Sequence, residues 1–212
     1  MLALGKAHFG STTARPAVLM SELAPLPEAE RQVRALPALY GPERSVVYLG
    51  DEATEDRFKA EAPRHRIVHV ASHGLFEEAS PLYSSVILTP GRDASTEDGL
   101  LEAWEILDLE LDADVVILSA CETGRGRIAS GEGIVGTSWA LLAAGARAAV
   151  VSQWKVDAAS TTALMTALHR RLARGETGTA VHLRSATLEV MTNPRYAHPF
   201  YWAPFVLVGN PF

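Results

Sequence analysis

One cysteine and one histidine each follow an apolar run at the point where a glycine-containing loop begins. Cys121, the only cysteine in the chain, comes directly after the run Val115–Ala120, and His73 comes two residues after the run Ile67–Ala71. A thiol is only partly ionised near neutral pH, and a nearby imidazole promotes the thiolate that acts as a nucleophile. Position 121 follows position 73 by 48 residues. These residue types, in equivalent places, predict a cysteine–histidine dyad of the kind that cysteine peptidases use.

The two apolar runs are expected to be central strands of a parallel sheet, because strands covered on both faces read as nearly continuous apolar segments. Ligands of open α/β sheets bind outside the carboxyl ends of strands, which favours chemistry at Cys121 and His73. The alternative for Cys121 is a core position, since free cysteine usually behaves as a small hydrophobe. His69 lies deeper in its run, and we interpret it as a hydrogen-bonded core histidine. The remaining histidines lie in terminal, strand-start or helical contexts without a partner motif: His8, His65, His169, His182 and His198.

Gly74 follows His73 directly and has no side chain, so its backbone N–H can approach a substrate carbonyl. We predict that the N–H groups of Gly74 and Cys121 stabilise the oxyanion of a tetrahedral intermediate. The alternative is that Gly74 makes a turn, and both roles are compatible.

Around these residues, apolar runs alternate with segments of helical periodicity, which is typical of a parallel α/β sheet with helices on its faces. Pro27 suits the first turn of a helix that Gly41-Pro42 would end, and Thr54 suits a helix cap. The expected strands are Met1–Phe9, Ser45–Leu49, Ile67–Ala71, Ser84–Leu88, Val115–Ala120, Ala148–Gln153 and Phe205–Val208. The expected helices are Pro25–Tyr40, Thr54–Ala60, Leu100–Leu107, Ile134–Ala144, Thr161–Ala173 and Thr179–Met191.

Composition limits the possible functions. The 212 residues carry a formal charge of −6, and no basic stripe is available to neutralise phosphates, so we expect no direct contact with nucleic acid. One cysteine excludes an internal disulfide and a cysteine-rich zinc site. The first residues do not form a signal peptide, and no apolar run approaches the ~18 residues that span a bilayer. We therefore expect a cytoplasmic protein without a membrane segment, folded as a single domain over residues 1–212.

Several motifs together resemble the CHAT domain, a caspase-like family often fused behind tetratricopeptide repeats. The resemblance covers about three-quarters of the chain and implies a caspase/separase-type fold, a three-layer α/β sandwich, with thiol endopeptidase activity. Members of that family usually carry upstream sequence, so we expect this chain to lack the upstream part of the usual domain. The matching segments, in family order, are 70–74 (VASHG), 118–124 (LSACETG), 131–133 (GEG), 145–147 (GAR), 152–157 (SQWKVD) and 201–209 (YWAPFVLVG).

The resemblance also implies a binding pocket for the residue before the scissile bond, formed near Ser152, Trp154 and Asp157. An acidic group there would select arginine or lysine by charge pairing. The alternative for Asp157 is a cap on the helix that begins near Ala158, a preferred use of aspartate. Many relatives carry two acidic residues after the tryptophan, whereas this chain has Ala158 in the second place, which bears on the basic preference.

Two further patterns have structural interpretations. The segment 131–136 (GEGIVG) matches the dinucleotide-binding pattern, but that pattern belongs in the tight turn directly after a strand, and about ten residues separate it from Ala120. We predict that its glycines allow a small-residue helix to pack closely against the sheet. Glu102, Glu105 and Asp108 recur at helical spacing, which predicts a solvated acidic face; no histidine is placed to complete a metal site.

The sequence thus predicts a cysteine endopeptidase that acts on proteins or peptides through Cys121 and His73 without a cofactor, with cleavage after a basic residue. Two alternatives stay open: a catalytically silent caspase-like interaction module, and a nucleotide-binding domain that uses the glycine segment. The expected partners are a protein or peptide substrate and an upstream tetratricopeptide-repeat region or regulatory protein.

Overall fold

The computed structural model describes residues 1–7, 26–77, 79–93, 96–119, 132–154, 156–175 and 178–210. Its frame is a six-stranded sheet in the order β2-β1-β3-β7-β8-β9, in which only the β8–β9 pair is antiparallel. This confirms the expected, mostly parallel α/β architecture. The strands are β1 (Leu2–Ala7), β2 (Val46–Gly50), β3 (Ile67–Ala71), β7 (Val115–Leu118), β8 (Ala148–Ser152) and β9 (Phe205–Gly209).

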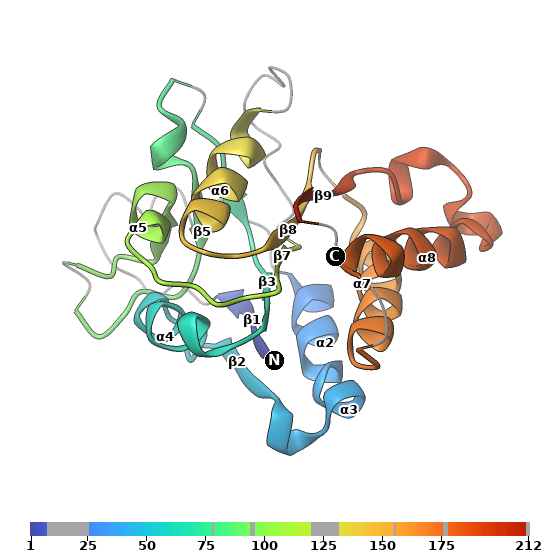
Figure 1. Cartoon of the computed structure of the whole chain (residues 1–212), viewed down its shortest axis with the longest axis horizontal. Coiled ribbons are helices and arrows are strands. Elements are labelled where there is room, and N and C mark those ends of the chain that lie inside the picture. The colour runs from blue at the N-terminus through green and yellow to red at the C-terminus, as the bar shows by residue number, and fades with distance from the viewer. Residues whose placement is uncertain are drawn as a thin grey trace.

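Helices cover both faces of this sheet, so the described residues form three layers (Figure 1). One layer holds α2 (Pro27–Ala35), α3 (Pro37–Tyr40), α7 (Ala158–Leu172) and α8 (Thr179–Met191). The other layer holds α4 (Glu55–Glu61), α5 (Ala103–Leu107) and α6 (Glu132–Ala143). Short 3₁₀ turns lie at Pro42–Arg44, Ala62–Arg64, Pro81–Tyr83, Pro194–Tyr196 and Pro199–Tyr201.

Alternation of side chains along the strands divides the core between the two faces. Val68 and Val116 belong to the apolar cluster under α4, α5 and α6, together with Phe58 of α4. Val115 and Ile117 belong to the cluster under α7 and α8. Because β3 and β7 are covered on both faces, their sequences are nearly continuous apolar runs, as expected.

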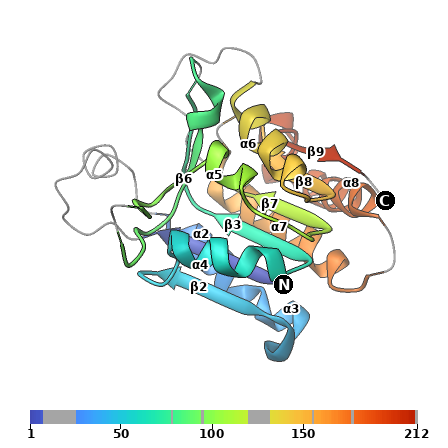
Figure 2. The same cartoon turned by 60° about the vertical axis from the view of Figure 1, so that its left-hand side comes forward.

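A second, three-stranded antiparallel sheet begins directly after the end of β3 (Figure 2). It consists of β4 (Gly74–Leu75), β5 (Ser85–Ile87) and β6 (Leu100–Glu102). The prediction of a helix over all of Leu100–Leu107 is therefore wrong for its first three residues. These residues pair with β5, and the helix starts only at Ala103, because the tertiary pairing overrides the local periodicity.

Two smaller corrections concern helix ends. Pro37 divides the single helix expected over Pro25–Tyr40 into α2 and α3, since proline lacks the N–H that an uninterrupted helix needs at that position. Thr54 stands at the N-cap of α4, as expected, but its side chain makes no capping hydrogen bond. Pro27 lies in the first turn of α2, where its missing N–H has no intrahelical partner in any case.

Candidate functional site

The carboxyl ends of β3, β7 and β8 meet at one edge of the large sheet. The parallel β3–β7 ladder pairs Ile67 with Val115 and Val70 with Leu118. It extends one residue further, because the Ser119 N–H donates to the Val70 carbonyl at 2.9 Å. The predicted nucleophile Cys121 lies outside the described residues. The structure thus defines the strand that leads to Cys121 and the complete strand that leads to His73.

His73 and Gly74 stand at the junction between the two sheets. The His73 side chain is buried, and its carbonyl accepts a hydrogen bond from the Ile87 N–H at 2.9 Å. Gly74 pairs with Val86 in the antiparallel β4–β5 ladder. Residue pairs in such a ladder alternate between hydrogen-bonded and non-hydrogen-bonded, so the bond at His73 makes Gly74–Val86 the non-hydrogen-bonded pair.

This pairing determines where the Gly74 amide points. In a non-hydrogen-bonded pair the backbone N–H faces away from the neighbouring strand, so the ladder directs the Gly74 N–H away from β5. Gly74 is half-buried and lies in a strand rather than in a turn, so the turn alternative is wrong. The Ser72 hydroxyl donates to the Ile87 carbonyl, so Ile87 is hydrogen-bonded to both Ser72 and His73 where the two sheets meet. The role of Gly74 as an oxyanion donor stays a prediction.

The three predicted substrate-binding residues lie from the last residue of β8 to the N-cap of α7. Ser152 is the buried last residue of β8 and pairs with Phe205 of β9, whereas Trp154 is half-buried. The Asp157 carboxylate accepts a hydrogen bond from the Ser160 N–H at 2.8 Å and caps α7. The capping alternative is therefore confirmed, and the acidic pocket stays a prediction. Because β8 lies next to β7, this segment begins beside the strand that leads to Cys121.

A chain of buried polar side chains lies deeper in the sheet, on the face covered by α2 and α7. His69 Nε2 lies 2.8 Å from Gln32 Nε2 and 3.1 Å from Ser119 Oγ. Its Nδ1 lies 3.1 Å from His169 Nε2, and the Tyr40 hydroxyl lies 2.8 Å from His169 Nδ1. Gln32 Nε2 also donates to Ser119 Oγ at 3.2 Å. We call these five residues the buried histidine network.

The network confirms one prediction and adds a histidine that the sequence did not single out. His69 is a fully buried, hydrogen-bonded core histidine, as its depth in the apolar run indicated. His169, for which the sequence offers no partner motif, is equally buried, and its ring meets that of His69 edge-on, with the ring centroids 4.9 Å apart. Burial lowers the pKa of His69 to about 3, and burial followed by the proximity of His69 lowers the pKa of His169. Both rings are therefore neutral at ordinary pH.

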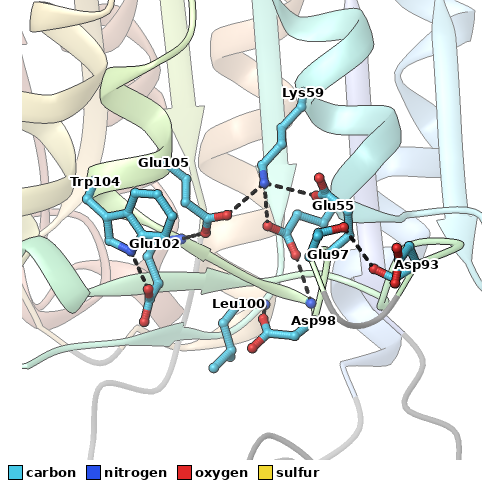
Figure 3. Close-up of polar contacts among 11 residues, drawn as sticks. Glu55, Lys59, Asp93, Glu97, Asp98, Leu100, Glu102, Trp104 and Glu105 are labelled. Carbon is cyan, nitrogen blue, oxygen red and sulfur yellow. Dashed lines mark hydrogen bonds and ion pairs between the residues drawn. The ribbon is translucent and has the colours of Figure 1, made fainter.

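A second polar cluster lies on the opposite face of the sheet, around Lys59 of α4 (Figure 3). The Lys59 ammonium is 2.8 Å from the carboxylate of Glu55, 2.9 Å from that of Glu97 and 2.7 Å from that of Glu105. Glu55 is fully buried, and its second oxygen accepts a hydrogen bond from the Gly99 N–H at 2.8 Å. The cluster ties α4 to the segment before β6 and to α5.

Burial and charge both act on Glu55. Burial is the largest cause that raises the pKa of Glu55, and the nearby Glu105 carboxylate raises it further. Hydrogen bonds from Lys59 and Gly99 lower it, and the resulting pKa is about 7. One ammonium faces three carboxylates, so the cluster holds an excess of negative charge when all three are ionised.

The predicted solvated face of Glu102, Glu105 and Asp108 is therefore wrong for Glu105, whose side chain is 10% exposed. Glu102 and Glu105 form a capping box at the start of α5, and the Trp104 indole donates to Glu102. These acids serve helix geometry and the Lys59 ion pair. Within the described ranges, no group of three or more histidine, cysteine, aspartate or glutamate side chains is arranged to hold a metal ion.

Residues 132–136 of the glycine segment form the start of α6, and the last of them, Gly136, packs closely. A Cβ on Gly136 would lie 2.9 Å from the carbonyl oxygen of Pro81, so only glycine permits this approach. The close packing expected for this segment is thus present at Gly136, although the contact is with the turn Pro81–Tyr83 rather than with the sheet. Of the helices that the structure describes, none has both the length and the apolar character needed to cross a membrane.

Solved structures share this architecture. The Arg specific cysteine proteinase gingipain R (RGPB) matches with a TM-score of 0.59 and 11% identity, covering 99% of this chain and 46% of that chain. The complex of Porphyromonas gingivalis RgpB pro- and mature domains matches with a TM-score of 0.57 and 11% identity, covering 99% of this chain and 47% of that chain. The fold is that of the caspase-like cysteine proteinases.

The family model of the CHAT domain matches residues 2–210, and the chain therefore belongs to the CHAT family. Tetratricopeptide repeat protein 28 of Mus musculus is 28% identical over 221 residues, which cover 88% of this chain and 9% of the mouse protein. The Homo sapiens protein of the same name is 26% identical over 221 residues, covering 88% of this chain and 8% of the human protein. The chain thus spans less than a tenth of the length of these relatives.

Proposed function

We propose that the chain is a cysteine endopeptidase in which Cys121 attacks a peptide carbonyl and His73 transfers the protons. The observation that carries this proposal is the register of β3 and β7. Residue 67 pairs with 115 and residue 70 with 118, an offset of 48 positions, and the same 48 positions separate His73 from Cys121. Neighbouring strands lie about 4.8 Å apart, so a dyad in this register is within reach of a thiol–imidazole hydrogen bond.

The reaction proceeds through a covalent intermediate. His73 takes the thiol proton of Cys121, and the sulfur adds to the carbonyl carbon to form a tetrahedral oxyanion. The Gly74 N–H, which the β4–β5 ladder turns away from β5, donates to this oxyanion. The C–N bond then breaks as His73 returns the proton to the leaving amine, and a thioester remains on Cys121. Water hydrolyses the thioester, with His73 accepting its proton, and the free thiol is restored.

The proposed substrate is a protein or peptide with arginine or lysine before the scissile bond. Support comes from Asp157, whose carboxylate stands at the N-terminus of α7, beyond the end of β8. Gingipain R, which shares the fold, is described as Arg specific. At 11% identity that likeness carries the fold alone, so the basic preference rests on Asp157.

The dyad is tested with fluorogenic peptides that carry Arg, Lys, Asp, Asn or Leu before the scissile bond. Cys121→Ala removes the nucleophile and should abolish cleavage. His73→Ala should lower kcat/KM by about 100-fold or more, since general acid–base catalysis contributes at least that factor. His65→Ala is the matched control, because His65 lies just before the opposite end of the same strand, β3. Cleavage by both dyad variants at the wild-type rate would refute the assignment.

The thiol is also tested directly, without a peptide substrate. Cys121 is the only cysteine, so alkylation by iodoacetamide followed by mass spectrometry reports on this one sulfur. The pH midpoint of the alkylation rate should lie below the value of about 8.5 for a free thiol and should rise in His73→Ala. A free-thiol midpoint that His73→Ala leaves unchanged, with no cleavage of any peptide, would favour the catalytically silent interaction module.

The basic preference is tested separately with Asp157→Asn. Asparagine caps helices as well as aspartate does, so this variant keeps the cap of α7 and removes only the charge. The ratio of kcat/KM for the Arg peptide over the Leu peptide should fall about tenfold or more, the size of one charge-assisted hydrogen bond. An unchanged ratio, or cleavage after Asp and never after Arg or Lys, would overturn the basic preference while leaving the dyad in place.

A further inference from the structure

The buried histidine network joins the two strands that lead to the proposed dyad. Its strand members are His69, four residues before His73, and Ser119, two residues before Cys121. Its helical members, Gln32 of α2 and His169 of α7, belong to the layer that covers this face of the sheet. Adjacent strand residues on the same face are apolar, among them Ile117. The strand positions that contribute to the network are therefore His69 of β3 and Ser119 at the end of β7.

The Gln32 amide determines which ring nitrogens of His69 and His169 carry a proton. The Gln32 amide nitrogen can only donate, so the nearby His69 Nε2 accepts. A neutral ring with an acceptor Nε2 carries its proton on Nδ1, and His69 Nδ1 then donates to His169 Nε2. His169 in turn donates through Nδ1 to the Tyr40 oxygen. Each ring nitrogen thus has a defined role as donor or acceptor, and the two rings have fixed orientations.

Three hydrogen-bond contacts position Ser119. Its main-chain N–H donates to the Val70 carbonyl at 2.9 Å, which is the last bond of the β3–β7 ladder that the structure describes. Its hydroxyl contacts His69 Nε2 at 3.1 Å and accepts from Gln32 Nε2 at 3.2 Å. The side-chain contacts therefore add to the ladder at the point where β7 ends.

We propose that His69 and Ser119 are positioning residues for the peptidase reaction, because they fix the end of β7 in register with β3, the strand that leads to His73. This inference rests on the proposed function. A purely structural role would require only that the buried polar groups find partners. A positioning role requires in addition that loss of the network alters the reactivity of Cys121.

The test compares Ser119→Ala and His69→Gln with a matched control, Ser45→Ala. Ser45 Oγ donates to the Gly41 carbonyl at 2.9 Å beside the start of β2, at the opposite end of the large sheet. The same hydroxyl loss therefore occurs far from β7. For each variant we would measure the melting temperature, kcat and KM on the best peptide, and the pH dependence of Cys121 alkylation by iodoacetamide.

Ser119→Ala and His69→Gln should lower kcat about tenfold or more with KM changed less than threefold, and should raise the pH midpoint of alkylation toward about 8.5. Ser119→Thr, which restores the hydroxyl, should recover most of the lost kcat. Ser45→Ala should leave kcat and the alkylation profile at wild-type values.

Two results would overturn the inference, and they are distinguishable. If the wild type cleaves peptides and both network variants match Ser45→Ala in kcat and alkylation, the network is structural and only this inference fails. If the wild type cleaves no peptide and His73→Ala leaves the alkylation profile unchanged, the proposed function fails and this inference fails with it.

Discussion

Acidification should destabilise this fold through His69, by an amount that follows from its burial. In the folded chain the pKa of His69 is lowered to about 3, against 6.5 for an unperturbed histidine. Between these values the unfolded chain binds a proton that the folded chain does not. The stabilising contribution is therefore complete above pH 6.5 and is lost as the pH falls toward 3. The slope approaches about 1.4 kcal/mol per pH unit, which gives about 2 kcal/mol between pH 7 and pH 5.

The measurement is urea unfolding of the wild type and His69→Gln at pH 7, 6 and 5, at constant ionic strength. Tryptophan fluorescence can follow the transition, since the chain has four tryptophans. The difference in unfolding free energy between the two proteins should shrink by about 2 kcal/mol from pH 7 to pH 5. His65→Gln gives the baseline for replacing a histidine near the amino end of β3. A difference that does not change with pH would refute the argument that burial keeps His69 neutral.

Three further outcomes are expected. Glu55 has a raised pKa, so its stabilising contribution is present below pH 4.5 and is lost as the pH rises through about 7; Glu55→Gln should remove this dependence in the same urea series. Gly145→Ala should destabilise by about 1–3 kcal/mol, because Gly145 has φ 111° and a Cβ would lie 2.3 Å from the Leu111 carbonyl oxygen. Gly175→Ala, at φ 72° with open space around it, should be milder in a thermal melt, and an equal loss would contradict the steric argument. Phe58→Ala should lower the unfolding free energy by about 3–5 kcal/mol in urea, because its side chain is fully buried; a loss under 1 kcal/mol would contradict its place in the core.

The contributions of His69 and Glu55 to stability depend on pH with opposite signs. Each variant must therefore be compared with the wild type, because the pH curve of the wild type alone cannot separate them. As the pH falls, the histidine removes stability and the glutamate restores it, over overlapping ranges. A flat stability profile of the wild type would therefore be compatible with two large, cancelling contributions. Only the difference between each variant and the wild type isolates one group.

The sequence predicted elements well where a long periodic or apolar pattern is also what the tertiary structure uses. The run Ile67–Ala71 and the helix Thr179–Met191 have the predicted bounds, and the parallel sheet follows from the alternation of such elements. Prediction failed where pairing is short and non-local. The strand Leu100–Glu102 pairs with residues some fifteen positions away, and no local pattern distinguishes its three residues from the first turn of a helix.

The same distinction holds for the candidate site. Cys121, His73 and Gly74 were predicted because each follows an apolar run that reads as a strand in the sequence, and their roles stay predictions. The strands β3 and β7 were also predicted, whereas their register comes from the structure. The partners of His69 were not found, since His169 is 100 residues away in sequence and Gln32 is 37 away. Neither partner lies in a motif, and only the packing of α2 and α7 on the sheet brings them together. A histidine inside an apolar run was the one available signal that polar partners must exist.

Buried positions on the two faces of the sheet should differ in how freely their sequences can drift during evolution. Around Phe58, under α4, α5 and α6, the core is hydrocarbon, and swaps of similar volume are usually tolerated in such a core. On the opposite face, each member of the buried histidine network has partners that would be left unsatisfied by its replacement. Substitutions in the buried histidine network should be accepted only when the partner residues change as well. A saturation library of this chain is thus expected to show permissive positions around Phe58 and restrictive positions around His69, although both residues are equally remote from solvent.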